Sequence, residues 1–123
     1  MKFYRLLPEN VRKLEFLIYE NFLQNWKVDI ESLEHSIDEE TAAVVFNNPS
    51  NPTGALFDRN HMEQLVAVCD KFKVPIVADE IYAGMVFPGR SFVSFAEVNS
   101  KVPMIVCGGL SKRFLVPGWR MGW

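Results

Sequence analysis

Three continuous apolar runs along the chain predict buried strands. They cover residues 41–46, 74–78 and 103–107, and none of them alternates between apolar and polar positions. Runs of this kind are typical of parallel strands that are buried on both faces. Asparagine, proline, glycine or acidic residues follow each run, and these residues mark where the strands end.

Helical spacing of apolar residues predicts helices between and before these strands. One helix is expected over residues 59–72, with Asp58 as its N-cap. A shorter helix is expected over residues 30–37, with Asp29 as its N-cap. The buried stripe predicted for the longer helix consists of Met62, Leu65, Val66, Cys69 and Phe72.

The remaining segments are shorter or less regular. Residues 2–7 predict a short strand, and residues 11–24 predict an amphipathic helix. Residues 25–28 are expected to form a connector, and residues 94–98 a short helix. The order of strand, helix, strand, short helix and strand predicts an α/β fold with a mostly parallel sheet and flanking helices.

Composition and charge exclude several classes of partner. The chain has 123 residues, which is one domain or less, with 49% hydrophobic and 23% charged residues. Its net charge of −2 attracts neither nucleic acid nor an anionic membrane. No apolar run is long enough to span a bilayer and no signal peptide is visible, so a cytoplasmic protein is expected.

The cysteines and histidines give no sign of a metal site. Cys69 and Cys107 are expected to be buried, reduced thiols. His35 and His61 stand apart from each other and fall among polar helical positions, so both are predicted to lie on the surface.

Polar residues follow all three predicted strands. Asn51 follows the first, Asp79 and Tyr82 follow the second, and Lys112 follows the third. Ligands of open α/β sheets bind at the carboxyl ends of the strands, so these side chains are expected to converge. Each residue alone has a simpler explanation. Asp79 alone could be a helix N-cap, and an isolated lysine beside glycines is usually solvated.

Three motifs together resemble the class I/II (fold type I) pyridoxal-phosphate aminotransferases, most closely their tyrosine-specific branch. The first is Asn-Asn-Pro-Ser-Asn-Pro-Thr-Gly at residues 47–54, and the second is Asp-Glu-Ile-Tyr at 79–82. The third, at residues 109–122, contains Lys112 and places Arg120 eight positions later. The resemblance covers residues 26–123 and, more loosely, 2–9.

The resemblance implies roles in binding pyridoxal phosphate. Lys112 would bond covalently to the cofactor's aldehyde and act as the catalytic acid and base. Asp79 would pair with the ring nitrogen, Asn51 and Tyr82 would donate hydrogen bonds to the phenolate oxygen, and Arg120 would bind the phosphate. No metal is implied.

The implied activity is transfer of the amino group of an aromatic amino acid, such as tyrosine, to a keto acid such as oxoglutarate. The full enzyme would be a homodimer, and this chain a partial cofactor-binding large domain, with the small domain beyond Trp123. Two alternatives remain open. The chain could be an inactive fragment or non-enzymatic partner, or it could belong to a related enzyme such as an alanine aminotransferase or aminocyclopropane-carboxylate synthase.

The chain departs from the family pattern at two places within it. Many relatives carry serine or threonine three positions before the lysine, as a hydroxyl for the phosphate, where this chain has Gly109. The stretch at residues 10–25 is longer than the family's usual connection, which suggests an inserted helix.

Overall fold

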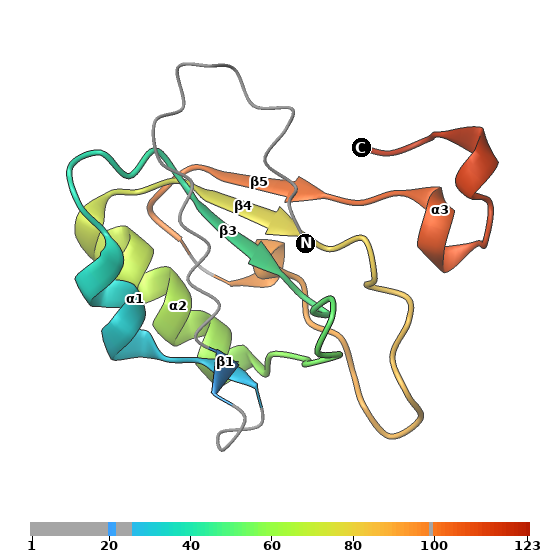
Figure 1. Cartoon of the computed structure of the whole chain (residues 1–123), viewed down its shortest axis with the longest axis horizontal. Coiled ribbons are helices and arrows are strands. Elements are labelled where there is room, and N and C mark those ends of the chain that lie inside the picture. The colour runs from blue at the N-terminus through green and yellow to red at the C-terminus, as the bar shows by residue number, and fades with distance from the viewer. Residues whose placement is uncertain (1–19, 22–25, 99) are drawn as a thin grey trace.

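The computed structural model describes residues 20–21, 26–98 and 100–123 (Figure 1). A parallel sheet forms its centre, and two helices pack on the sheet. In chain order the elements are β1 (Glu20–Asn21), β2 (Lys27–Val28), α1 (Ile30–Ser36), β3 (Val44–Asn47), α2 (Arg59–Phe72), β4 (Ile76–Asp79), the 3₁₀ turn η3 (Phe95–Glu97), β5 (Met104–Cys107), α3 (Leu110–Arg113) and the 3₁₀ turn η4 (Pro117–Trp119).

The three strands of the main sheet lie in the order β3, β4, β5, and all are parallel. Their register aligns Asn47 with Asp79, and Asp79 with Cys107, so the three strands end level with one another. In Figure 1 the three arrowheads point towards α3 and the C-terminal segment. The predicted α/β class with a parallel sheet is confirmed.

Helix α2 is the main packing partner of the sheet, and its bounds are those that the apolar spacing predicted. The Asp58 carboxylate accepts a hydrogen bond from the backbone N–H of His61 at 2.8 Å, which caps the first turn. Asp29 caps α1 in the same way, through the N–H of Ser32 at 2.9 Å. Met62 and Leu65 are fully buried, as expected from the stripe.

Among the described residues, helices cover one face of the sheet. Ile76 and Ala78 of β4 are fully buried beneath the helices, and Phe46 of β3 stacks on Phe95 with 5.2 Å between ring centroids. On the opposite face, Val45 is 44% exposed and Ile105 is 61% exposed. The prediction that these strands are buried on both faces is therefore wrong for the described chain, because its helices pack on one side only.

Three predictions of burial also need correction. Phe72 is 37% exposed, because it falls on the last residue of α2, where the helix leaves the sheet. Cys107 is half-buried, whereas Cys69 is fully buried, and burial raises the pKa of the Cys69 thiol to about 12. His61 was predicted on the surface but is buried.

His61 is buried because it joins α2 to β2. Its Nε2 accepts a hydrogen bond from the backbone N–H of Val28 at 3.2 Å, and its ring meets Phe57 edge-on at 5.1 Å. Burial, reinforced by the nearby charge of Lys27, lowers the pKa of His61. A neutral imidazole is required at this position, since a protonated Nε2 could not accept that hydrogen bond.

The N-terminal predictions are corrected where the structure describes the chain. Glu20–Asn21 form strand β1, not part of a helix over 11–24. They pair antiparallel with β2, Lys27–Val28, which was expected to be a connector. The predicted strand over 2–7 and most of the predicted helix lie outside the described residues. Apart from Glu20–Asn21, the inserted helix at 10–25 also lies outside them and stays a prediction.

Within the described residues, no helix combines the length and apolar character needed to cross a membrane.

Candidate active site

The turns that follow β3 and β4 meet beyond the ends of these strands. Asn51 lies in the turn after β3, and its side-chain Nδ2 donates a hydrogen bond to the Tyr82 hydroxyl at 3.1 Å. Tyr82 is half-buried in the turn after β4. These two residues are 31 positions apart in the sequence, and the parallel pairing of β3 with β4 brings them together.

Lys112 approaches Tyr82 from the third strand end. It lies in the short helix α3, and its Nζ is 5.6 Å from the centre of the Tyr82 ring. An ammonium at this distance from an aromatic face is attracted by the ring's electron density. Lys112 is exposed, so its amine is accessible to a ligand at the edge of the sheet. Of the five predicted site residues, Asn51 and Lys112 therefore both adjoin Tyr82.

Asp79 is the last residue of β4 and accepts three hydrogen bonds at two of its atoms. Its Oδ1 accepts a hydrogen bond from the N–H of Ile81 at 3.2 Å. Its backbone carbonyl accepts one from the N–H of Asn48 at 3.1 Å and another from Nδ2 of Asn47 at 3.0 Å. Residues 81–84 form turns and not a helix, so Asp79 is no helix N-cap. Its side chain is half-buried at the same edge of the sheet.

Arg120 stands apart from these four residues. It is exposed, it has a left-handed backbone with φ of 49°, and its Nη1 donates to the carbonyl of Pro117 at 3.2 Å. Within the described chain, no hydrogen bond or ion pair links it to Asn51, Asp79, Tyr82 or Lys112. It shares one closed loop with Lys112, because Gly109 and Gly122 pair as an antiparallel bridge.

Gly109, the position where the resemblance leads one to expect a hydroxyl, is closely packed. A Cβ placed there would lie 3.0 Å from Cδ1 of Ile81 and 3.0 Å from the carbonyl oxygen of Met121. Both contacts are tighter than ordinary van der Waals distances. A serine at this position would therefore need Ile81 or the neighbouring backbone to move.

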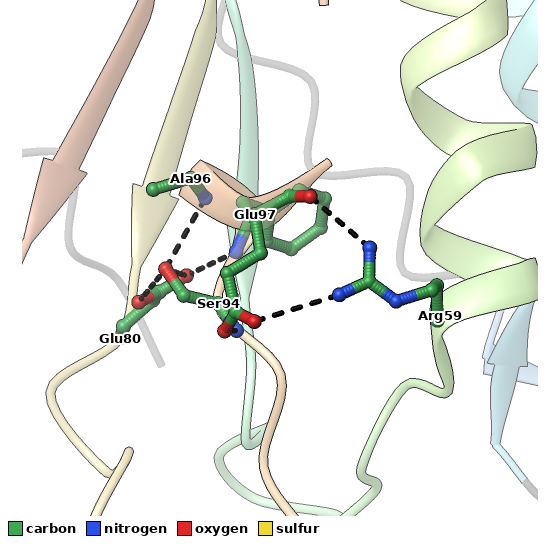
Figure 2. Close-up of polar contacts among 6 residues, drawn as sticks. Arg59, Glu80, Ser94, Ala96 and Glu97 are labelled. Atoms are coloured by element: carbon green, nitrogen blue, oxygen red, sulfur yellow. Dashed lines mark hydrogen bonds and ion pairs between the residues drawn. The ribbon is translucent and has the colours of Figure 1, made fainter. Parts of the chain in front are cut away.

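Glu80 was missed by the sequence analysis, although it adjoins Asp79. It is a buried carboxylate that accepts hydrogen bonds from Ser94 Oγ, at 2.8 and 3.0 Å, and from the N–H of Phe95 at 2.7 Å (Figure 2). Glu97 of the same 3₁₀ turn pairs with Arg59 of α2 at 3.5 Å. The turn after β4 is thereby tied to η3 and, through η3, to the start of α2.

Asn47 was also missed as a separate contributor. It closes β3, and its side chain contacts both Asp79 and Asn51. The only available signal for both residues was a polar side chain beside a predicted strand end, and such a signal does not say which partner the side chain will find.

A groove of about 720 Å³ opens beside Asn51 and Tyr82. One wall is the loop over 49–56, and the other is the loop over 82–90. Gly54 in the first loop has φ of 70°, a conformation that favours glycine, and its N–H donates to the carbonyl of Ser50 at 2.9 Å. The groove gives a ligand access to the two side chains from solvent.

Comparison with known proteins shows which family the chain belongs to. The family described as aminotransferase class I and II matches residues 10–123. The chain belongs to this family. Its predicted resemblance to class I/II aminotransferases is therefore confirmed.

Individual relatives are similar along the same stretch. Tyrosine aminotransferase of Bos taurus is 48% identical, and that of Homo sapiens 44% identical, each over the whole of this chain but only 24% of the relative. The chain thus spans about a quarter of the length of these curated relatives.

Solved aminotransferases share the fold. Tyrosine aminotransferase from Leishmania infantum superposes with a TM-score of 0.79 at 38% identity, covering 82% of this chain and 27% of that one. Alanine aminotransferase from Pyrococcus furiosus gives a TM-score of 0.77 at 36% identity, covering 81% and 25%.

Proposed function

We propose that this chain forms the cofactor-binding part of a pyridoxal-phosphate-dependent aminotransferase that acts on aromatic amino acids. The observation that carries the proposal is the cluster of Asn51, Tyr82 and Lys112 at the carboxyl ends of the parallel strands. A hydroxyl and an amide that share a hydrogen bond offer two donors to one acceptor, and a primary amine lies next to them.

The donor set suits pyridoxal phosphate. Asn51 and Tyr82 would donate to the phenolate oxygen of the cofactor, and Lys112 would bind its aldehyde carbon. The Asp79 carboxylate would favour a protonated ring nitrogen by charge, and Arg120 would supply a cation for the phosphate. When bound, the cofactor supplies an electron sink that stabilises negative charge at the substrate's α-carbon.

The chain's own residues would then handle the proton. Lys112 would take the proton from the substrate's α-carbon as a general base and deliver it, as a general acid, to the carbon that carried the cofactor's aldehyde. The N–H of Ile81, which donates to Asp79 Oδ1, would hold that carboxylate in place for the ring nitrogen. Tyr82, hydrogen-bonded to Asn51 and facing Lys112, would fix where the amine meets the substrate.

The proposed substrate rests on the similarity to tyrosine aminotransferases, and it concerns the whole protein and not this chain alone. Tyrosine aminotransferases are among the relatives that match the whole chain, which supports an aromatic amino donor. We further propose a keto acid acceptor such as oxoglutarate, a homodimer as the active form, and a cytoplasmic location.

The direct test traps the cofactor on the protein. The protein is incubated with pyridoxal phosphate and reduced with borohydride, and the modified residue is identified by mass spectrometry. One adduct on Lys112 is expected, and Lys112→Ala should abolish it. Lys101→Ala, which removes another exposed lysine, should leave it unchanged.

The role of Asp79 has its own readout in the same protein. Asp79→Ala should keep the Lys112 adduct but slow transamination by about 100-fold or more, since the ring nitrogen loses its counter-ion. Labelling scattered over several lysines, or no labelling, would contradict the proposal and favour an inactive fragment or non-enzymatic partner.

A further inference from the structure

Asn47 links two of the proposed cofactor-binding residues through both ends of its amide. Its Oδ1 accepts a hydrogen bond from the backbone N–H of Asn51 at 2.7 Å. Its Nδ2 donates to the backbone carbonyl of Asp79 at 3.0 Å. An asparagine side chain carries an acceptor and a donor at a fixed separation, so one side chain here sets the spacing between two turns.

We propose that Asn47 is a positioning residue that holds Asn51 and Asp79 in register for the cofactor. This inference rests on the proposed function, in which Asn51 contacts the phenolate oxygen of the cofactor and Asp79 contacts its ring nitrogen. Asn47 itself is half-buried at the end of β3 and would act through its two partners.

The strand pairing explains why Asp79 needs this contact. Asn47 and Asp79 are neighbours in the parallel register, and the Asp79 carbonyl already accepts the N–H of Asn48 at 3.1 Å. Asn47 occupies the second lone pair of that carbonyl. The peptide group after Asp79 is thereby fixed just where the chain leaves the sheet, and the N–H of Ile81, two residues on, holds the Asp79 carboxylate.

Asn51 depends on Asn47 in a different way. It lies in a turn between two prolines, and its side chain must reach the Tyr82 hydroxyl at 3.1 Å. The bond from its N–H to Asn47 anchors the backbone of that turn to the strand end. Loss of the bond would leave the side chain of Asn51 free to turn away from Tyr82.

Two substitutions separate the two ends of the amide. Asn47→Asp keeps an oxygen that can accept the N–H of Asn51 but removes the donor to Asp79. Asn47→Ala removes both. Thr53→Val is the matched control, because Thr53 lies in the same loop and its Oγ1 accepts the N–H of its near neighbour Ala55, at 3.2 Å.

The rate of amide hydrogen exchange, measured in the complete protein without cofactor, reports on the contacts of Asn47 with Asn51 and with Asp79. Asn47→Ala should speed exchange at the amides of Asn51 and Ile81 by about tenfold or more, since the Ile81 N–H reports the position of the Asp79 carboxylate. Asn47→Asp should speed exchange at Ile81 alone. Thr53→Val should change neither amide.

A spectroscopic titration connects the contact to the cofactor. The absorbance of bound pyridoxal phosphate is followed against pH in the wild type, Asn47→Ala and Thr53→Val. The group that titrates is the imine between Lys112 and the cofactor, and a positively charged ring nitrogen lowers its pKa. A loosened Asp79 leaves the ring nitrogen less charged, so the midpoint for Asn47→Ala should move to higher pH by about 0.5 to 1 unit. Thr53→Val should titrate with the wild type.

The outcomes distinguish this inference from the proposed function. If the wild type shows no cofactor absorbance, the proposed function fails, while the exchange pattern still tests the bridge. If the wild type binds cofactor but Asn47→Ala exchanges and titrates like the wild type, only the inference fails. Equal acceleration at both amides in Asn47→Asp would also overturn it, and this variant decides the matter if Asn47→Ala does not fold.

Discussion

The sheet with α2 and the segment that carries Lys112 are stabilised in opposite ways. In the first region, Met62 and Leu65 of α2 and Ile76 of β4 are fully buried in one hydrophobic core. In the second region, residues 110–123, Leu115 is 80% exposed and Trp123 is 68% exposed. One region is closed by its own side chains, and the other lies beyond the edge of the sheet in Figure 1.

Backbone contacts take the place of a core in the lysine segment. The N–H of Gly108 donates to the carbonyl of Trp123 at 2.9 Å, and the N–H of Trp123 donates back at 3.1 Å. The N–H of Leu110 adds a bond to the carbonyl of Met121 at 3.2 Å. Apolar packing therefore specifies the scaffold, whereas close backbone approaches at glycines place Lys112.

The largest expected difference between the regions comes from truncating a leucine in each. Leu65→Ala removes a fully buried side chain and should lower the free energy of unfolding by about 2–5 kcal/mol. Leu115→Ala should change it by less than about 0.5 kcal/mol, because its side chain is mostly in solvent. Urea denaturation of both variants measures this, and equal losses would contradict the comparison.

A glycine substitution tests the backbone contacts of the lysine segment. Gly109→Ala should cost about 1–3 kcal/mol, because its methyl group would meet Ile81 and the carbonyl of Met121 at 3.0 Å. Gly118→Ala is the control in the same segment, since nothing lies within 4 Å of the added carbon. Thermal unfolding of the two proteins should separate them, and a tolerated Gly109→Ala would refute the close approach.

Removing the cap of α2 should have a moderate effect on the core region. Asp58→Ala loses the hydrogen bond to the N–H of His61 and should destabilise the protein by about 1 kcal/mol. The ion pair of Asp58 with Lys27 adds little, because both side chains are largely exposed. Asp58→Asn, which keeps a capping oxygen, should recover most of the loss in the same denaturation assay.

The smallest expected effect is a pH dependence from His61. Its pKa is lowered in the folded protein, chiefly by burial, so folding favours the neutral ring. Stability is complete above the unfolded pKa of about 6.5 and falls as the pH drops below it, because the unfolded chain then binds the proton more readily.

Urea midpoints at pH 7.5 and 5.5 measure this dependence in the wild type and in His61→Gln, which should lose part of it. Asp58 does not interfere in this range. The hydrogen bond with Lys27 is the largest cause that lowers the pKa of Asp58 below its ordinary 3.8, so the carboxylate stays charged at both pH values. An identical midpoint shift in both proteins would rule out His61 as the source.

Sequence patterns predicted the elements that repeat a local rule. The bounds of α2 followed from apolar spacing and from Asp58. Polar residues and glycines marked where the three strands end, at the predicted residue for β5 and one residue later for β3 and β4. Predictions from these patterns failed where a residue's contacts come from a distant part of the chain. His61 falls among polar positions of a helix, yet the N–H of Val28 and the ring of Phe57 bury it.

The sequence by itself determined the α/β class, the three parallel strands and the family, because each rests on local patterns or on motifs read along the chain. The tertiary structure alone decided how the motifs meet. Register places Asn47 beside Asp79, and the turns bring Asn51 and Lys112 to Tyr82. These contacts join residues about 30 positions apart, and their geometry depends on strand pairing, which no local pattern specifies.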